Sequence, residues 1–427
     1  MSFVHVLGGN TLVTIAQGLQ FLLLARVLGP HEFGLIAATG GITALLLPFS
    51  GAGAANVMVM RGARDQAVLP TYFGNALMVM LGTAAVLIAI STAVVGVLLD
   101  HQVATSLMLL FGISELLAGK TVDICWHVFL ARDEVPRTSR MQAFHSGVRF
   151  LSAALFAAIA TDKTAAHWVW WGLFGNVVVA LALLRNTMRV VGPLRFDFKL
   201  VRAEFTNGLS FAVGFSASSF YTDADKIFLA RYAGSQIVGE YTMAFRIVQI
   251  ILTPIRALFF SLQAKMYRAG EAGLEGAIRV TKSVLLPLLA GALALGVAFY
   301  LAAPLLTLVA GERYRGSVGI LRAQWLLPTV LALQSMLGAT LSTSGFHRAA
   351  ATAQIVCALF ICGLCMFLIP RLGWTGAVIS SYASQGALIL MLLWSIYKRR
   401  DPPAVRAAAR AARERQRAEG PEPEAAP

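Results

Sequence analysis

The stretch LARVLGPHEFG, from Leu24 to Gly34, returns 205 residues later as LARYAGSQIVG, from Leu229 to Gly239. Five of the eleven positions are identical, and glycines recur at matching places: Gly29 and Gly34 in the first copy, Gly234 and Gly239 in the second. Each copy follows a long apolar run, so we expect it to form the hairpin after the first helix of one half. A hairpin between two long helices needs residues that tolerate unusual backbone angles, which is the role expected of these glycines. The repeat therefore predicts two halves of related architecture in the same orientation.

The composition around this repeat is that of a membrane protein. Of 427 residues, 57% are hydrophobic and only 13% are charged, with a mean hydropathy of +0.71. A soluble domain carries about 25% charged residues, and one span takes roughly 20 apolar residues plus a turn, which allows on the order of twelve spans. Soluble catalysis and DNA binding are excluded, because no long hydrophilic segment precedes the tail that starts near residue 398.

Apolar runs and polar breaks divide the chain into two sets of six segments. The expected spans are 5–28, 33–58, 72–99, 103–130, 141–160, 166–186, 204–230, 237–263, 281–309, 316–345, 349–369 and 374–397. This predicts an all-α polytopic membrane protein in which two six-helix lobes, 1–195 and 196–400, are related by a parallel repeat around a central cavity. The remainder, 401–427, reads as a basic, partly disordered cytoplasmic tail, either a helix on the membrane surface or a solvated segment.

Basic residues are distributed unevenly between the two sides of the predicted membrane. With the N-terminus inside, 23 Lys and Arg fall in cytoplasmic loops and the tail, against 6 on the other side. This bias predicts cytoplasmic N- and C-termini in a bacterial inner membrane, and it explains most of the +14 net charge without any nucleic acid. The first apolar stretch lacks signal-peptide features and is expected to be a retained span.

Polar side chains within the spans locate the expected cavity, because such groups face protein or water rather than lipid. The candidates for a cationic substrate site are Arg149, Arg246, Arg256, Arg322 and Lys120. The candidates for ion coupling or for polar cavity lining are Asp225, Lys226, Glu115, Asp123, Asn10, Gln17, Gln249 and Tyr221. The alternative for each is a plain helix–helix contact or a local ion pair, such as Lys120 with Asp123 or Asp225 with Lys226 or Arg231.

An excess of fixed cations suits a phosphate-bearing ligand, because guanidinium groups match phosphate oxygens in charge and geometry. Pro48 and Pro254 fall in corresponding spans of the two halves and are candidate flex points. The four cysteines lie in apolar runs without a histidine partner, so no metal site and no cofactor is expected.

The strings ARVLGPHEFGLIAATGGI, YTDADKIFLARYAGSQIVGEYTMAFRI and LGWTGAVIS resemble the Wzx-type oligosaccharide flippases, the polysaccharide biosynthesis proteins of the multidrug/oligosaccharidyl-lipid/polysaccharide (MOP) exporter superfamily. The resemblance implies two six-helix lobes around a cavity that opens to one side at a time. It implies transfer of undecaprenyl-diphosphate-linked oligosaccharides from the cytoplasmic to the periplasmic leaflet, with membrane lipids, and possible polysaccharide polymerase and chain-length proteins, as partners. Asp225 and Lys226 match the family's acidic-plus-basic position, and coupling to H⁺ or Na⁺ is possible.

Two other function classes are alternatives to a flippase. A cation-coupled multidrug exporter of the same superfamily would share the spans, but its usual cavity is richer in acids. A membrane enzyme, such as a polysaccharide polymerase, would need a large outward loop with catalytic groups, and the loops near Asp162 and Glu312 are short. A transporter without enzymatic activity is therefore expected. Peptidoglycan lipid flippases usually have two additional spans, which makes them a poorer match.

Overall fold

The computed structural model describes residues 2–98, 104–271 and 273–399, and these residues form helices and short connections with no strand among them. The tail 401–427 lies outside this described part. Each of the predicted spans overlaps a helix or a run of consecutive helices. The chain is a multi-pass, all-helical membrane protein.

The first half of the chain contains ten helical elements, two of them 3₁₀ turns (η1, η2) and one a π-helix (η3). They are α1 (Ser2–Leu46), η1 (Leu47–Phe49), α2 (Ala54–Gly62), η2 (Gln66–Val68), α3 (Leu69–Leu98), α4 (Thr105–Gly112), η3 (Ile113–Gly119), α5 (Lys120–Ala131), α6 (Val135–Ile159) and α7 (Ala165–Val191). The second half contains α8 (Phe198–Tyr232), α9 (Ser235–Glu271), α10 (Leu274–Ala302), η4 (Ala303–Leu305), α11 (Leu306–Ala310), η5 (Glu312–Tyr314), α12 (Arg315–Ala323), α13 (Leu327–Thr343), α14 (His347–Leu372) and α15 (Trp374–Arg399).

Six helices of the described chain are long and apolar enough to cross a membrane, or seven if the bent pair α12–α13 counts as one span. The number twelve therefore stays a prediction. Among the helices that fall short, α6, α8 and α9 carry internal charges. Charged groups at membrane depth face protein or water, so these helices are the ones expected to line an interior.

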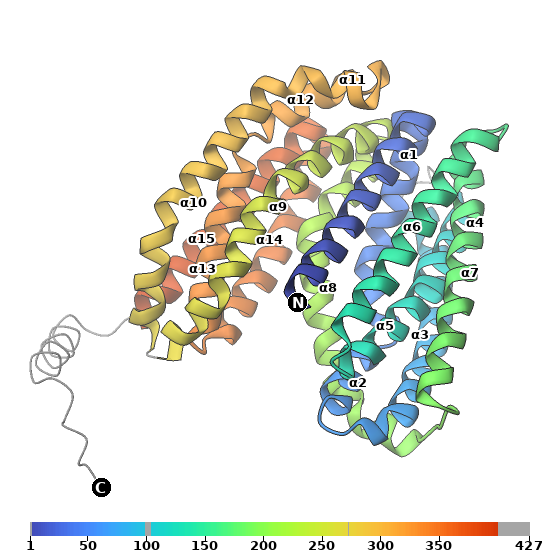
Figure 1. Cartoon of the computed structure of the whole chain (residues 1–427). Helices are drawn as coiled ribbons and strands as arrows, with labels where there is room; N and C mark the ends of the chain where they lie inside the picture. Colours follow the sequence, from blue (N-terminus) through green and yellow to red (C-terminus); the bar gives the residue numbers. More distant parts are fainter. Residues whose placement is uncertain (1, 99–103, 272, 400–427) are drawn as a thin grey trace, which may run out of the picture.

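Element α1 is two helices joined by a sharp turn at Gly29, whose φ of 75° and ψ of 171° are non-helical. The rings of Phe21 and Phe33 lie 5.0 Å apart. Twelve residues of straight helix would separate them by roughly 18 Å, so the chain must reverse between them. Figure 1 shows the two limbs, dark blue rising and lighter blue descending. Gly234, with φ 85°, makes the corresponding turn between α8 and α9.

The two copies of the repeat pack against each other through their second glycines. A Cβ on Gly34 would lie 1.7 Å from the carbonyl oxygen of Ser235, and one on Gly239 would lie 2.0 Å from that of Pro30. Gly34 matches Gly239 and Pro30 matches Ser235 in the repeat, so the contact is reciprocal. The turn role expected of all four glycines therefore holds for Gly29 and Gly234 only. Gly34 and Gly239 lie inside helices and permit close backbone contact between the two halves.

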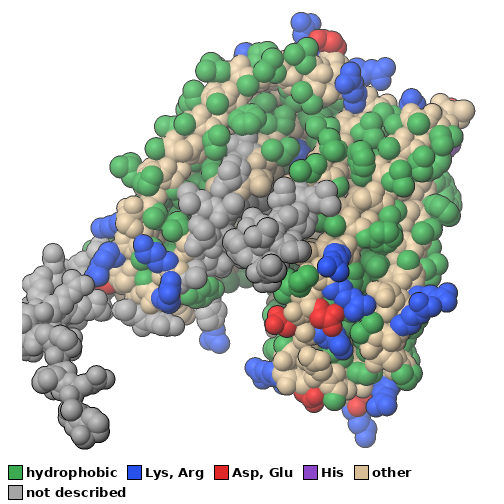
Figure 2. Space-filling view, in the orientation of Figure 1, with side chains coloured by type: hydrophobic (Ala, Val, Ile, Leu, Met, Phe, Trp, Pro, Cys, Tyr) green, Lys and Arg blue, Asp and Glu red, His purple; other side chains and the backbone are tan. Residues whose placement is uncertain are grey.

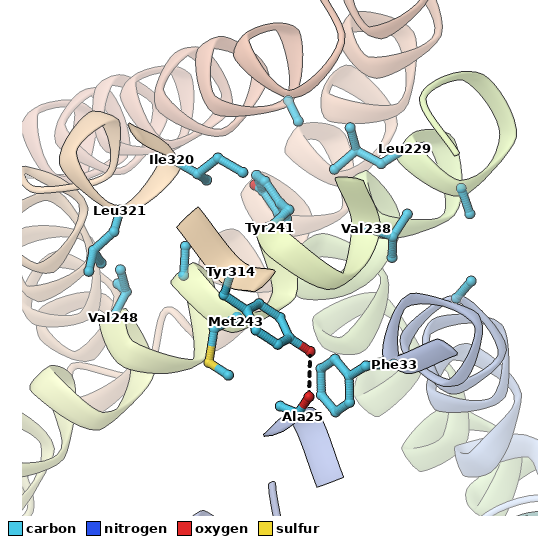
Figure 3. Packing of buried hydrophobic residues seen from close by; sticks show 14 of the residues in the cluster. Ala25, Phe33, Leu229, Val238, Tyr241, Met243, Val248, Tyr314, Ile320 and Leu321 are labelled. Atoms are coloured by element: carbon cyan, nitrogen blue, oxygen red, sulfur yellow. Dashed lines mark hydrogen bonds between the residues drawn. The ribbon is translucent and has the colours of Figure 1, made fainter. Parts of the chain in front are cut away.

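A buried polar bond lies beside this joint. Tyr314, from η5, is fully buried, and its hydroxyl donates to the carbonyl oxygen of Ala25 on α1 at 3.0 Å (Figure 3). Phe33 lies beside the bond, and Leu229 and Val238 belong to the same buried apolar cluster. The first and second halves thus share one continuous apolar core around α1 and α9.

The helices form two groups that diverge away from this joint. In Figure 1, α2–α7 lie on one side and α10 and α13–α15 on the other, while the groups separate toward the lower end. Helix α8 packs against both α1 and α14. Figure 2 shows Lys and Arg gathered at the lower ends of both groups, the ends that include α2 and the start of α10. The loops predicted to be cytoplasmic therefore share one end of the molecule.

Candidate functional site

Three neighbouring cavities lie between the helices. The N-terminal cavity, of about 450 Å³, is lined from α1, η3, α6 and α7 and by Arg246 of α9. The central cavity, of about 560 Å³, lies between α1, α8 and α9. The C-terminal cavity, of about 260 Å³, is lined from α8, α9, α10, α13, α14 and α15. Gln17 and Arg246 border both the N-terminal and the central cavity, and Gln249 borders both the central and the C-terminal one, so the three form a continuous system.

Arg246 occupies the junction between the N-terminal and central cavities. Its guanidinium carbon lies 5.3 Å from the centre of the Phe21 ring, a distance at which the ring face attracts a cation. The ion pairs found in the described part of the chain do not include Arg246. An unpaired guanidinium at this depth is costly unless water or an anion reaches it. Arg246 is thus a ready anion-binding group.

Arg149, by contrast, is held by an acid in the N-terminal cavity. Its Nη1 lies 3.1 Å from Oε1 of Glu115, which belongs to the π-helix η3. Asn176 donates to the Ser114 hydroxyl at 2.9 Å, and its carbonyl oxygen lies 3.0 Å from Nε2 of His145. The extra residue of a π-helix redirects side chains and is often found at functional sites. This cavity therefore contains a positioned but largely charge-compensated network.

Two predicted cationic residues lie away from the cavities. Arg322 is exposed on α12, with its guanidinium carbon 5.5 Å from the centre of the Tyr300 ring. Lys120 is buried among α5 and its neighbours, and its Nζ donates to Asp123 at 2.7 Å. Neither residue lines any of the three cavities. The prediction that all five cations converge on one cavity is therefore wrong for these two. The local pair of Lys120 with Asp123 was the alternative interpretation, and the geometry supports it.

The acidic-plus-basic position in α8 separates into two pairs. Lys226 pairs with Asp223, one helical turn earlier, and both line the central cavity. Asp225 faces the C-terminal cavity and accepts a hydrogen bond of 2.5 Å from the Tyr241 hydroxyl. Lys226 balances the charge of Asp223, whereas Asp225 is held by neutral donors, the Tyr241 hydroxyl and the backbone N–H of Lys226.

The C-terminal cavity is lined by amides and hydroxyls together with apolar side chains. Its polar lining comprises Asp225, Gln249, Gln334, Ser335, Gln354, Ser381, Ser384 and Gln385. Gln385 is 7% exposed, and its side-chain oxygen has no hydrogen-bond partner in the described structure. This cavity differs from the N-terminal one in offering hydrogen-bonding groups rather than paired charges.

The remaining predicted residues are placed as follows. Pro48 lies in the 3₁₀ turn η1, between α1 and α2, where the helix is interrupted. The side chains of Asn10, Tyr221, Pro254 and Arg256 lie outside the part of the structure that is described. Among the described residues, no group of three or more His, Cys, Asp or Glu side chains could hold a metal ion.

Several cavity residues were missed although the sequence contained a signal for them. His145 and Ser152 flank Arg149 at helical spacing on α6, and Ser381, Ser384 and Gln385 follow the same rule on α15. Polar residues at helical spacing identified cavity candidates in other spans but not in α6 and α15. The pairing of Glu115 with Arg149 left no signal, because the two are 34 residues apart and meet only through the packing of η3 against α6.

Comparison with known proteins identifies the family. The family model for polysaccharide biosynthesis proteins matches residues 2–261, more than half of the chain. The chain belongs to this family. A curated relative, the succinoglycan biosynthesis transport protein ExoT of Rhizobium meliloti (strain 1021), is 24% identical over 292 residues. That alignment covers 65% of this chain but only 57% of the relative's length.

Several solved transporter structures share the fold of this family member. The lipid II flippase MurJ in an inward closed conformation aligns with a TM-score of 0.71 at 11% identity, covering 92% of this chain and 87% of MurJ. An inward-facing multidrug resistance MATE transporter of the MOP superfamily aligns with a TM-score of 0.69 at 17% identity, covering 90% and 94%. An outward-facing MATE transporter aligns with a TM-score of 0.59 at 16% identity, covering 92% of this chain and 94% of the transporter. The helical transporter fold that the sequence resemblance to MOP exporters implies is therefore confirmed.

Proposed function

We propose that this protein flips an undecaprenyl-diphosphate-linked oligosaccharide from the cytoplasmic to the periplasmic leaflet of the bacterial inner membrane, for surface polysaccharide synthesis. The observation that carries the proposal is Arg246, an unpaired cation at the junction of two cavities in a member of the polysaccharide biosynthesis family. A diphosphate brings the oxygens that a guanidinium binds best. The relatives are named as transport proteins and flippases, which favours transport over enzymatic catalysis.

The proposed mechanism is alternating access by the two helix groups. The groups meet at the reciprocal glycine joint and separate toward the basic ends of the helices. Because basic loops are expected in the cytoplasm, we infer that this end of the molecule faces the cytoplasm, and cytoplasmic N- and C-termini are part of the proposal. Rocking about the joint would close this side and open the other. The polyprenyl tail stays in lipid while the diphosphate enters beside Arg246.

The multidrug alternative fits the cavity less well. Cationic compounds need an acid whose charge is not balanced; Lys226 balances Asp223, and the carboxylate of Asp225 is occupied by hydrogen bonds from the Tyr241 hydroxyl and the Lys226 backbone. Both residues nevertheless remain candidates for coupling to H⁺ or Na⁺, since a change in occupancy there would alter the contacts of α8. Polymerase and chain-length proteins are the partners that such a flippase would supply.

The test is complementation of a strain that lacks this protein, with surface polysaccharide as the readout. We expect Arg246→Ala to reduce polysaccharide at least about tenfold, because a charge-assisted bond to phosphate is lost. Arg246→Lys keeps the charge and should retain part of the activity. Arg371→Ala is the matched control, since Arg371 is exposed at the end of α14 and bonds its own helix. Normal polysaccharide from Arg246→Ala, at equal membrane abundance, would reject the proposal.

A further inference from the structure

We infer that the C-terminal cavity is a carbohydrate site, which receives the sugar next to the diphosphate. This inference rests on the proposed function and adds the position of the sugar within the site. Arg246 and Gln249 are three residues apart on α9, so their side chains project from the same helix face about 4.5 Å apart along the axis. Arg246 borders the central cavity, while Gln249 borders both the central and the C-terminal cavity. A sugar bonded to a phosphate at Arg246 would therefore meet Gln249 first.

The polar groups of this cavity require a ligand that both donates and accepts hydrogen bonds. A buried side-chain oxygen without a partner, as in Gln385, costs free energy until a donor reaches it. An ionised phosphate offers acceptors only, and a polyprenyl tail offers neither kind of group. A sugar hydroxyl supplies both. The side chain of Ser384, fully buried, donates to the Ser381 carbonyl and leaves its own oxygen to accept.

The remaining lining suits a sugar ring as well. Phe245 and Phe259 contribute aromatic carbon, and Leu331 and Leu288 contribute aliphatic carbon to the same cavity. Sugars present apolar C–H faces together with their hydroxyls. The volume of about 260 Å³ lies below the range of roughly 300–1,000 Å³ that drug-sized ligands occupy. A space of this size fits a small group, such as one sugar residue, rather than a whole oligosaccharide.

The experiment compares two lipids on the purified, full-length protein in detergent. One probe is a short-chain polyprenyl diphosphate without sugar, and the other is the same lipid carrying one N-acetylhexosamine. Gln385→Leu, close in volume, removes the amide. We expect this variant to bind the sugar-bearing lipid about five- to tenfold more weakly. Its affinity for the sugar-free lipid should be unchanged. Gln334→Leu, on α13, should act in the same direction and guards against a packing defect peculiar to one position.

Control variants separate this inference from the proposed function. Gln236→Leu changes an exposed amide on α9 that borders none of the three cavities and should alter neither affinity. Arg246→Ala should weaken the binding of both lipids. Unchanged binding of both lipids by this variant would count against the proposed function. An affinity for the sugar-bearing lipid that stays at the wild-type value in both glutamine variants would overturn the carbohydrate site. Tighter binding of both lipids by Gln385→Leu would also overturn it and identify the cavity as a site for the apolar tail.

Discussion

The N-terminal and C-terminal cavities flank the same central space but differ in how their polar groups are satisfied. In the N-terminal cavity the polar residues hold one another: Glu115 forms an ion pair with Arg149, and Asn176 forms a hydrogen bond with His145. In the C-terminal cavity the polar groups are mostly neutral, and the oxygen of Gln385 lacks a partner. Arg246, between them, is the cation without an acid partner among the described residues that line these cavities. The difference indicates that charge recognition belongs to the junction, whereas hydrogen-bond recognition belongs to the C-terminal side.

The comparison of the two cavities depends on the glycine joint that holds the two helix groups together. Adding a methyl group at this joint should have the largest effect on stability. Gly34→Ala places a Cβ 1.7 Å from a backbone oxygen of α9, so the two helices must move apart. Overpacking of this kind costs about 3 kcal/mol or more when the backbone cannot relax. We expect a marked fall in the yield and thermal stability of the purified protein, and the same from Gly239→Ala. Gly291→Ala, where a Cβ meets open space on α10, is the control.

The reciprocity of the joint makes this prediction specific. If Gly34→Ala unfolds at the same temperature as Gly291→Ala, the backbones are not in contact and the joint cannot guide the motion of the two groups. Within the two copies of the repeat, glycine would then be needed at Gly29 and Gly234, where the positive φ disfavours any side chain.

A second prediction concerns the charge balance of the N-terminal cavity. Glu115→Gln removes the acid that engages Arg149 while preserving a polar side chain of similar size. The cavity gains one net positive charge, so we expect sugar-free polyprenyl diphosphate to bind about three- to tenfold more tightly at low salt. The measurement is a titration of that lipid at two salt concentrations. Glu134→Gln, at the end of a loop, should leave the affinity unchanged.

Loss of the gain in the double variant Glu115→Gln with Arg149→Ala would identify Arg149 as the group released. A gain that persists without Arg149 would mean that the carboxylate acts on Arg246 through the cavity, and the contrast between paired and unpaired arginines would lose its basis.

Much of this arrangement could be predicted from the sequence because it has local causes. The apolar runs fix where helices occur, and the repeat around Gly29 and Gly234 locates both hairpins. Arg246, Gln17 and Gln249 were found because polar residues at helical spacing face an interior.

The rest depends on which helix faces which. Arg322 and Lys120 lie in apolar segments as Arg246 does, yet one is exposed and the other is paired within its own helix. Spacing along one helix gives the direction of a side chain relative to that helix only. The close contact at Gly34 and the pair of Glu115 with Arg149 join residues from different helices, and no periodicity in a single sequence encodes those contacts.

The smallest effect is expected for a cluster of charged residues outside the cavities. Its contribution to stability gives a reference value for an exposed ion pair, with which the buried groups can be compared. Glu134, before the first residue of α6, accepts from Arg132 at 2.7 Å and from Arg137 at 3.2 Å. The hydrogen bond from Arg132, with a further contribution from Arg137, holds the pKa of Glu134 below its usual value of 4.5. A lowered folded-state pKa gives stability that is fully present above the unfolded pKa and is lost as the pH falls through the folded one.

The measurement is thermal unfolding of the wild type and Glu134→Gln in detergent from pH 7 to pH 3. The wild type should be more stable by about 1–2 °C at neutral pH, since partly exposed pairs contribute only about 0.2–1 kcal/mol. The advantage should shrink below about pH 4.5 as the carboxylate takes up a proton. If the stability advantage of the wild type grew instead, the pKa of Glu134 in the folded state would have to be raised. Exposed ion pairs would then not be the weak reference against which the Glu115–Arg149 pair is judged.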